Sequence, residues 1–498
     1  MSKVTPFDIP LLINEICQYL SRSDLKHCML VSKAWAAWFA PVLWRELNCG
    51  GRYPDIPTMM RQQEHIQIVR NISMWSIRDS SERLPFPHVR RLEFKDDSRE
   101  DGIHRTEIRV LPLLEGITSL QHLKITLSLE HGNIYQQFIR TLESLPHLES
   151  LSLECRRFVD GKVIQDILRM CHRLERLSLS FTGSERHATQ EDRQEYMDTR
   201  AEIERMPEMR LCELSFDSDS DLVVENILQP LLERCTRIQK LDLGYGATDS
   251  TIRHLFKLLK ENNFPKLRHL VAGVRDAGHF QEAISEALSH VECGLESLEF
   301  MDNPSGPVIQ SLTQYHSCMT KLDITNVSLW ALSDLMAGLP NLRYFKSEVD
   351  SDYERSSRDI PFEKHWECLN LKNLRLRVPG WNYTAIERER KGSRRMLALD
   401  YVFSEIAKMT SLQVLILDYP IPDLFFKENG YLIRLADLKQ LRVFDLGSNI
   451  SPVGEEEALW MVENLPRLLE VHAPQMDKFG EVLFEKRPLL EIFKIVNW

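Results

Sequence analysis

From about residue 69 onward, the chain repeats one spacing of apolar side chains. An apolar residue is followed by two other residues, a second apolar residue, one other residue and a third apolar residue. The last two apolar positions are two residues apart, so they share one face of a short β-strand. About sixteen copies recur at a mean period of about 28 residues. The clearest copies begin at Leu148, Leu174, Ile238, Leu295, Met319, Leu371, Leu412 and Leu441.

Between these copies, apolar residues recur at steps of three and four, as on one face of an amphipathic helix. One such set is Val163, Ile164, Ile167 and Leu168. Strands that alternate with helices over short links predict a parallel sheet with a layer of helices along it. Since helices are wider than strands, the sheet is expected to curve. The pattern resembles the long class of leucine-rich repeat, which implies an α/β horseshoe solenoid.

Four segments exceed the repeat period, at about 95–110, 181–205, 348–367 and 378–396. Each follows directly on a predicted strand, so we expect all four at the same edge of the sheet. Insertions of this kind often lie on a binding face. The last one carries Trp381 and a run of charged residues, for which a solvated loop is the alternative interpretation.

The segment from residue 7 to 47 precedes the repeats and has helical spacing instead. A first helix has an apolar face formed by Ile13, Ile16 and Leu20. A second has a face formed by Leu25, Cys28, Ser32 and Trp35. Ser21 and Asp24 have the spacing of a capping box, which predicts the start of the second helix. Pro41 suits the first turn of a third helix that carries Leu43 and Trp44.

These helices resemble the F-box, the adaptor-binding module of cullin-type ubiquitin ligases. The matching positions are Leu20, Asp24-Leu25, Val31-Ser32-Lys33, Trp35 and Leu43-Trp44-Arg45-Glu46-Leu47. Ile9-Pro10 stands where the family usually has Leu-Pro, and the stretch from Pro10 to Ile16 is one residue shorter than the family pattern. The resemblance implies that the module binds a small adaptor, and through it a cullin.

The apolar surface of this segment exceeds what about forty residues can bury alone, so a partner should cover part of it. The residues expected to contact the adaptor are Ile9, Pro10, Ile16, Leu20, Leu25, Cys28, Val31, Trp35, Leu43 and Trp44. The alternative is a helical cap that only closes the end of the repeat domain.

The chain has 498 residues, of which 43% are hydrophobic and 27% charged, and this composition is typical of a soluble globular protein. It has no apolar run of about eighteen residues and no secretory signal, so we expect an intracellular protein, in the cytoplasm, the nucleus or both. The net charge of −11 opposes general binding to nucleic acid or to an anionic membrane.

The residue types that commonly catalyse reactions or bind metals form no recognisable motif in this sequence. The ten cysteines include no C-x-x-C pair, and the sixteen histidines include no H-E-x-x-H motif. Cys171 and Cys235 hold equivalent places in separate repeats, which indicates packing and not a disulfide. Gly244-Tyr245-Gly246 lacks the third glycine of a dinucleotide-binding loop. We therefore expect no enzyme activity, no metal and no cofactor.

In a solenoid of this kind, the residues between the buried strand positions point away from the core, and most of them here are polar. The late repeats differ, because apolar residues and arginines replace the polar ones. The residues expected to bind a target protein are Tyr344, Arg375, Arg377, Trp381, Val414 and Ile416. Aromatic, aliphatic and arginine side chains together are typical of protein interfaces. The alternative is a covered end of the sheet.

Taken together, the sequence predicts an F-box at residues 1–50, a helical connector at 51–68 and a leucine-rich-repeat solenoid at 69–498. The function implied by the resemblance is that of the substrate-recognition subunit of a ubiquitin ligase, monomeric within its complex. The adaptor would bind the F-box and the target protein would bind the repeats. The alternative is a repeat scaffold with no role in ubiquitin transfer, and whether the adaptor co-purifies would distinguish the two.

Overall fold

The computed structural model divides into two compact units, Met1–Cys235 and Thr236–Trp498, called here the N-terminal and the C-terminal unit. The structure describes residues 10–17, 19–43, 45–49, 69, 71–74, 88–94, 111, 114, 117–127, 133–155, 161–181, 190–218, 220–244, 248–273, 281–291, 294–300, 304, 306–349, 364–377, 394–417, 431–446, 454–473, 477–488 and 490–494. The predicted connector at 51–68 lies outside these residues.

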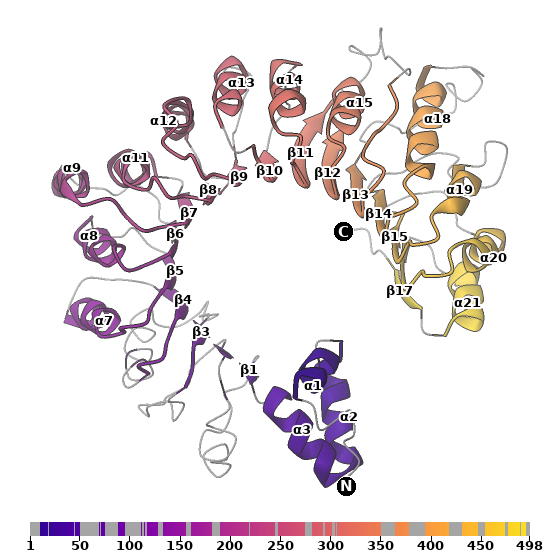
Figure 1. Ribbon diagram of the computed structural model, residues 1–498, viewed down its shortest axis with the longest axis horizontal. Helices are drawn as coiled ribbons and strands as arrows, with labels where there is room; N and C mark the ends of the chain where they lie inside the picture. The colour runs from indigo at the N-terminus through magenta and orange to yellow at the C-terminus, as the bar shows by residue number, and fades with distance from the viewer. Residues whose placement is uncertain are drawn as a thin grey trace. The chain divides into compact units, whose positions relative to one another are not determined.

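The N-terminal unit begins with three helices and continues into a parallel sheet (Figure 1). The three helices are α1 (Pro10–Cys17), α2 (Arg22–Val31) and α3 (Lys33–Leu43). The strands, in sheet order, are β1 (Glu46–Cys49), β2 (Asn71–Met74), β3 (Arg91–Phe94), β4 (His122–Leu127), β5 (Ser150–Cys155), β6 (Arg176–Phe181) and β7 (Glu213–Ser218). Because β1 pairs in parallel with β2, the sheet begins before residue 69, inside the range expected for the helical module.

Helices of the N-terminal unit lie side by side along one side of its sheet (Figure 1). They are α7 (Asn133–Glu143), α8 (Gly161–Met170), α9 (Gln190–Arg205), α10 (Asp221–Val223) and α11 (Gln229–Glu233), with a π-helical turn η4 (Val224–Leu228) between the last two. Helix α9 corrects the expectation of an insertion over residues 181–205. It is the ordinary helix of its repeat, and its Tyr196 and Ile203 are each 0% exposed.

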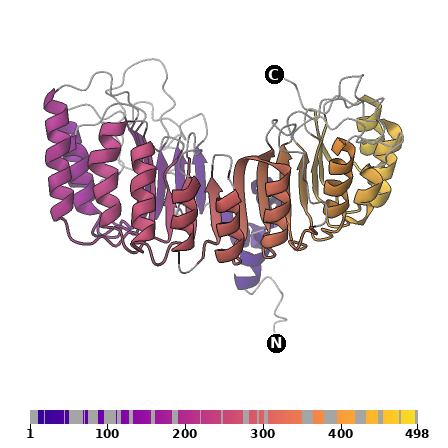
Figure 2. The same ribbon diagram turned by 90° about the horizontal axis from the view of Figure 1, so that it is seen from above.

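The C-terminal unit repeats the same arrangement. Its strands, in sheet order, are β8 (Lys240–Asp242), β9 (His269–Ala272), β10 (Ser297–Phe300), β11 (Lys321–Val327), β12 (Tyr344–Val349), β13 (Asn373–Arg377), β14 (Val414–Leu417), β15 (Val443–Asp445), β16 (Glu470–Ala473) and β17 (Glu491–Lys494). Its helices are α12 (Asp249–Lys260), α13 (Gln281–Ser289), α14 (Gly306–Tyr315), α15 (Leu329–Gly338), α18 (Arg394–Ala407), α19 (Tyr431–Arg434) with the 3-10 turn η7 (Leu435–Asp437), α20 (Glu455–Asn464) and α21 (Asp477–Lys486). Figure 2 shows the helices in front of the strands.

The apolar repeat of the sequence becomes the core between sheet and helices. In the copy that contains β6, Leu174, Leu177 and Leu179 are 1%, 2% and 1% exposed, whereas Ser178 between them is only half-buried. The same alternation of buried and half-buried residues runs through β5, β6 and β7. The predicted leucine-rich-repeat solenoid, a parallel sheet with its helices on one side, is therefore confirmed.

A recurring backbone contact sets the spacing of the repeats. The carbonyl just before one strand accepts N–H bonds from two consecutive residues of the next repeat. Glu149 accepts from Glu175 at 2.8 Å and from Arg176 at 3.1 Å, and the Arg268 carbonyl accepts from Glu296 at 2.8 Å and from Ser297 at 3.0 Å. This contact pairs the backbone groups at the start of each strand, which would otherwise be unsatisfied inside the stack.

Cys171 and Cys235 are free thiols, each 0% exposed, as their repeat positions predicted. Burial raises the pKa of both thiols, that of Cys235 to about 12. Two neutral thiols in an apolar setting behave as small hydrophobic side chains. Both are therefore part of the packing of their repeats.

Candidate functional site

The three N-terminal helices form a small core of their own. Ile13, Cys17 and Leu25 are each 7% exposed and Phe39 is 1% exposed. The ring of Trp35 lies 5.5 Å from that of Phe39, centroid to centroid, in a tilted arrangement. These side chains come from all three helices, so the core holds the helices against one another.

A capping box starts α2, as the sequence predicted. The Asp24 N–H donates to Ser21 Oγ at 3.1 Å, and the Ser21 N–H donates to Asp24 Oδ2 at 3.0 Å. The Ser21 hydroxyl also donates to Oδ2 at 2.6 Å. These hydrogen bonds lower the pKa of Asp24, because they stabilise its charged form. The box fixes where α2 begins relative to the end of α1.

The second and third helices differ from the prediction. Helix α2 ends at Val31, and Ser32 adopts an extended backbone with φ −163° and ψ 164°. The Ser32 hydroxyl then accepts the Trp35 N–H at 3.1 Å, so Ser32 caps α3. Pro41 lies inside α3 and does not open a new helix. The residues predicted to share one face of the second helix therefore lie on two helices, with Leu25 and Cys28 on α2 and Trp35 on α3.

Several large apolar side chains of this module face solvent. Tyr19 is 80% exposed, Leu30 is 82% exposed and Val31 is 62% exposed, while Leu12 is 38% exposed. Tyr19 lies in the turn between α1 and α2, and Leu30 and Val31 form the last turn of α2. Full burial of a large apolar side chain that is otherwise in water, as Leu30 is, stabilises a complex by about 1.5–3 kcal/mol. This exposed set is suited to protein binding.

The residues predicted to contact an adaptor occupy different depths in the module. Of the predicted residues whose side chains are described, Val31 is exposed. Leu25 is buried in the core of the module. The half-buried members are Ile16, Leu20, Cys28, Trp35 and Leu43. Pro10 opens α1, and Ile9 and Trp44 lie outside the described residues. The sequence reasoning missed Leu12, Tyr19 and Leu30, although an apolar residue off the buried stripe was the available signal.

The second candidate surface is the sheet face of the C-terminal unit that lies opposite its core. The strand register aligns Tyr344 with Asn373 and Val414, so they form one row across β12, β13 and β14. Arg375 aligns with Ile416 in the next row. Four of the six residues predicted to bind a target thus lie on three consecutive strands, β12, β13 and β14.

Their exposure fits an accessible face. Arg375 is exposed, and Tyr344, Val414 and Ile416 are half-buried. The backbone of Arg377 continues β13, and Trp381 lies outside the described residues.

Acidic residues neutralise the lysines on this face. Lys346 Nζ lies 2.9 Å from Asp323 Oδ2, and Lys321 Nζ lies 3.6 Å from Glu299 Oε2. The Lys321 ammonium also lies 5.5 Å from the centre of the Tyr344 ring. Burial raises the pKa of Tyr344, as does the nearby charge of Asp323, so its phenol stays neutral at physiological pH. The face offers a neutral aromatic ring beside aliphatic side chains.

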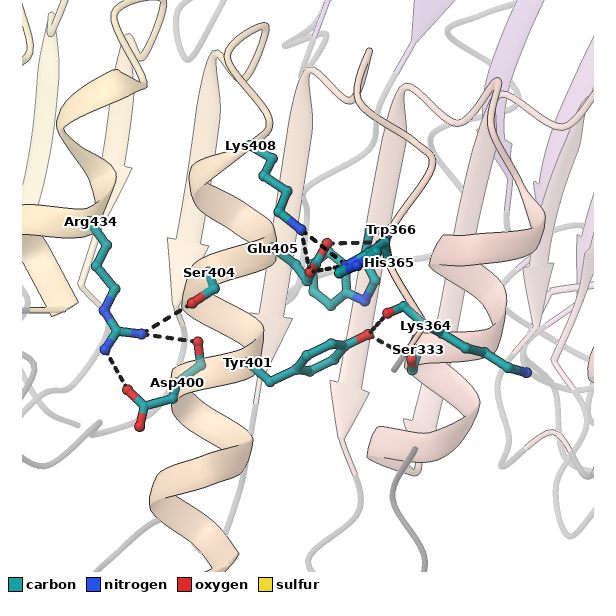
Figure 3. A network of polar contacts seen from close by, with 10 residues as sticks. All are labelled: Ser333, Lys364, His365, Trp366, Asp400, Tyr401, Ser404, Glu405, Lys408 and Arg434. Carbon is teal, nitrogen blue, oxygen red and sulfur yellow. Dashed lines mark hydrogen bonds and ion pairs between the residues drawn. The ribbon is translucent and has the colours of Figure 1, made fainter. Parts of the chain in front are cut away.

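A polar network around one buried carboxylate lies behind this face (Figure 3). Glu405, on α18, is 2% exposed. Its carboxylate accepts from Lys408 Nζ at 2.6 Å and from the Trp366 N–H at 3.0 Å, and its Oε1 lies 3.1 Å from His365 Nδ1. Burial alone would raise the pKa of Glu405, but the hydrogen bonds from Lys408, Trp366 and His365 together lower it.

The rest of the network joins neighbouring helices. The Tyr401 hydroxyl donates to the Lys364 carbonyl and lies 2.8 Å from the Ser333 hydroxyl. Arg434, on α19, donates to Asp400 Oδ1 at 2.6 Å. The network thus ties residues 364–368, which precede β13 and carry no helix, to α15 and α18. Since its one deeply buried carboxylate is fully engaged and stays charged, the arrangement indicates a structural clamp and not a general acid.

The described residues contain no group of three or more His, Cys, Asp or Glu arranged to hold a metal ion. Within the same part of the chain, no helix has the length and apolar character needed to cross a membrane.

Comparison with protein families identifies residues 7–42 as an F-box domain. The chain matches none of the curated proteins with which it was compared. Among solved structures, it is similar to the complex of Rad7 and Elc1 in yeast, at 12% identity and a TM-score of 0.36 over 94% of this chain and 88% of that one. It is also similar to a TLR13–ssRNA13 complex, at 14% identity and a TM-score of 0.35 over 87% of this chain and 68% of that one.

A protein from Bacteroides fragilis is similar at 16% identity and a TM-score of 0.33, over 47% of this chain and 66% of that one. At these identities and TM-scores, the structural similarities assign neither a function nor a partner to the chain. The F-box match and the chain's own repeat geometry stand on their own. The protein therefore combines an N-terminal F-box with a leucine-rich-repeat solenoid.

Proposed function

Starting from this F-box and repeat architecture, we propose that the protein is the substrate-recognition subunit of a cullin-type ubiquitin ligase. The F-box binds a small adaptor that bridges to the cullin, and the repeats bind the protein to be modified. The observation that carries the proposal is the exposure of Tyr19, Leu30 and Val31 on the F-box helices. Apolar side chains exposed together on so small a module are suited to a protein partner.

In this role the chain performs no chemistry of its own. Ubiquitin transfer takes place on a partner enzyme inside the cell, and the repeats bring the target close to it in a suitable orientation. Holding two reactants together raises the rate of a reaction between them without any catalytic group on the holder. The clamp around Glu405 supports this role because it stiffens the repeats behind the target-binding face.

The proposed target-binding face comprises Tyr344, Arg375, Val414 and Ile416, with Arg377 and Trp381 as further members from the sequence. Its neutral aromatic ring and aliphatic side chains suit an apolar anchor of the target, and Arg375 adds direction through hydrogen bonds. Residues far from the F-box in the chain therefore bind the target, so the two interactions can be separated by mutation.

The adaptor interaction is tested by co-purification with the full-length chain. We expect the double variant L30D/V31D to lose the adaptor, because two aspartates would replace apolar contacts at the interface. The matched control is L469D/F484D, which changes side chains that are 54% and 62% exposed in the C-terminal unit. An adaptor that is retained equally by both variants and by the wild-type protein would refute the F-box role and favour the repeat scaffold.

The target interaction is tested separately with R375E/R377E. We expect this variant to keep the adaptor and to lose partners that the wild-type chain retains, as measured by quantitative mass spectrometry. The variants L30D/V31D and R375E/R377E should thus lose different proteins. If the partners of R375E/R377E match those of the wild-type chain throughout, the target binds elsewhere.

A further inference from the structure

The core of the F-box helices contains two cysteines, one on α1 and one on α2. Ile13 and Cys17 are four residues apart on α1, and each is 7% exposed. Leu25 and Cys28 are three residues apart on α2, so they also share one face of their helix. Leu25 belongs to the same buried cluster as Cys17, and Cys28 packs against that cluster. Both thiols therefore lie on the sides of α1 and α2 that form the small core.

The two thiols differ in how a small reagent can reach them. Cys17 is buried, whereas Cys28 is half-buried and keeps part of its surface in solvent. Burial raises the pKa of Cys17, and the neighbouring Cys28 thiol raises it further. The two sulfur atoms are thus close enough to influence each other, and Cys17 stays protonated at neutral pH. Because the thiolate is the reactive form of cysteine, an oxidant reacts at Cys28 first.

The other cysteines that the structure describes lack this combination of an accessible and a buried thiol in one cluster. Four of them are 0% exposed, namely Cys155, Cys171, Cys235 and Cys368. Cys212 and Cys318 lie nearer the surface in separate repeats, and their thiols donate to backbone carbonyl oxygens at 3.2 Å and 3.4 Å. Cys17 and Cys28 are therefore the pair to consider for chemistry.

We propose that Cys17 and Cys28 form a reversible disulfide when the adaptor-free chain meets hydrogen peroxide, and that this disulfide weakens adaptor binding. In a reducing compartment, disulfides are usually transient and redox-sensing, which fits a pair that is reduced in the folded module. The inference rests on the proposed function, since its consequence concerns the adaptor that the F-box binds. It assigns a modification site to two residues that otherwise have only a packing role.

The reaction takes two steps and consumes one molecule of peroxide. The Cys28 thiolate attacks a peroxide oxygen, so that an S–O bond forms, the O–O bond breaks and hydroxide leaves, which takes up a proton to become water. Cys28 is then a sulfenic acid. The Cys17 sulfur attacks the Cys28 sulfur, the S–S bond forms and the S–O bond breaks, and the Cys17 proton completes a second water. The two thiols give up two electrons, and a thiol reductant reverses the bond by exchange.

The disulfide alters the surface that is proposed to bind the adaptor. Tyr19 follows Cys17 by two residues, and Leu30 and Val31 directly follow the turn of α2 that carries Cys28. These three apolar side chains are 80%, 82% and 62% exposed. Bonded sulfurs are about 2.0 Å apart, whereas non-bonded atoms in contact are about 3.5–4.0 Å apart. The bond therefore draws the end of α1 and the middle of α2 together and shifts the exposed side chains relative to one another.

Adaptor binding and oxidation should oppose each other in both directions. Cys28 is among the residues that the F-box resemblance places at the adaptor interface, so a bound adaptor covers the thiol that peroxide must reach. If oxidation weakens adaptor binding, adaptor binding must disfavour oxidation by linkage. The free chain is therefore sensitive to peroxide, and the assembled chain is protected.

The test uses the full-length chain and its adaptor. The reduced chain is treated with hydrogen peroxide, digested with trypsin and analysed by mass spectrometry without reduction. We expect a disulfide between the tryptic peptides 4–22 and 27–33, which carry Cys17 and Cys28. Adaptor affinity is measured by titration before oxidation, after it, and after treatment with dithiothreitol. We expect oxidation to weaken the complex about tenfold, the reductant to restore it, and a bound adaptor to slow the linkage of the peptides about tenfold.

Single variants separate the two steps. C17A should accumulate Cys28 as a sulfenic acid that a 1,3-diketone reagent traps, because the second thiol is gone. C28A should form neither product and should keep its adaptor affinity in peroxide. Since alanine leaves a cavity in a small core, thermal unfolding of each variant is recorded, and C28V repeats the test with a larger apolar side chain. The matched control is C318A, which removes an exposed thiol and should respond to peroxide as the wild-type chain does.

The proposal is overturned if the two peptides stay unlinked, or if the linked chain binds the adaptor as tightly as the reduced chain does. It is also overturned if C28A loses the adaptor in peroxide as the wild-type chain does, since another residue then carries the effect. A reduced chain that never binds the adaptor would contradict the ligase role, and with it the adaptor effect, even where the linked peptides form. Adaptor binding that peroxide leaves unchanged would contradict only the redox site.

Discussion

The F-box helices and the repeats are built from the same apolar residue types but use them in opposite ways. In the repeats, leucines and phenylalanines are enclosed between sheet and helices, and Phe345 and Leu374 are each 0% exposed. In the F-box, Leu30 and Val31 are 82% and 62% exposed over a core of only a few side chains. Both regions also expose single apolar side chains, such as Leu469 and Phe484 in the repeats, but in the F-box Leu30 and Val31 are consecutive residues over a core of only a few side chains. Under the proposed function, these two residues bind a partner and contribute little to the fold.

The largest effect that would test this contrast is expected in the core of the repeats. Phe345→Ala on β12 should destabilise the C-terminal unit by about 3–5 kcal/mol, because it removes a fully buried ring and leaves a cavity. The measurement is the midpoint of urea unfolding, together with hydrogen exchange in β11 and β13. Tyr315→Ala, at a side chain that is 46% exposed, is the control. Equal losses of unfolding free energy in the two variants would contradict the assignment of Phe345 to the core.

A smaller effect is expected in the polar clamp. Glu405→Gln should cost about 1–3 kcal/mol, because the amide cannot accept from Lys408, Trp366 and His365 as the carboxylate does. The exposed Arg200–Glu204 pair provides the control, and Glu204→Gln should cost far less.

The clamp also makes stability depend on pH. The folded-state pKa of Glu405 is lowered, so its contribution is fully present above the unfolded value of about 4.3 and is lost as the pH falls through the lower folded value. Wild-type and E405Q should therefore differ most near neutral pH and converge as the pH falls through the lowered folded-state pKa of Glu405. A difference that widens on acidification would contradict the assigned charge state.

Elements with strong local signals could be predicted from the sequence. The apolar spacing at Leu174, Leu177 and Leu179 was sufficient to place β6, and the pair Ser21 and Asp24 placed the start of α2. Both signals depend on neighbours within a few residues. The sheet register could be predicted in principle as well, since Arg91 and Arg176 each immediately precede the second apolar position of their copies.

Other features depend on contacts that no local pattern encodes. In the sequence, Leu25, Cys28 and Trp35 keep a helical spacing across Ser32. In the structure, α2 ends at Val31, and Ser32 caps α3. Helix α9 looked like an insertion because most of its residues are polar, and burial of its few apolar side chains requires α8 and α11 beside it. The Glu405 clamp joins residues about forty positions apart, and the exposure of Leu30 depends on which side of α2 the small core occupies.

The capping box gives a further, weaker test within the F-box. Ser21→Ala should destabilise α2 by about 0.5–2 kcal/mol, because the Asp24 N–H loses its acceptor. Hydrogen exchange of the α2 amides in the full-length chain measures this, and Ser23→Ala, in the first turn of α2 beside the cap, is the control. Faster exchange in the Ser23 variant than in the Ser21 variant would argue against the box as the start of the helix.

The smallest effect on stability is expected where the effect on binding should be greatest. Leu30→Ala and Val31→Ala together should change the free energy of unfolding by no more than about 0.5 kcal/mol, because both side chains are already in water. The same double variant should weaken the adaptor complex by at least tenfold, since burial of each side chain is worth about 1.5–3 kcal/mol. Calorimetry of the purified chain and titration with the adaptor measure the two quantities independently. A large loss of stability would mean that these residues belong to the F-box core, and the contrast between the two regions would fail.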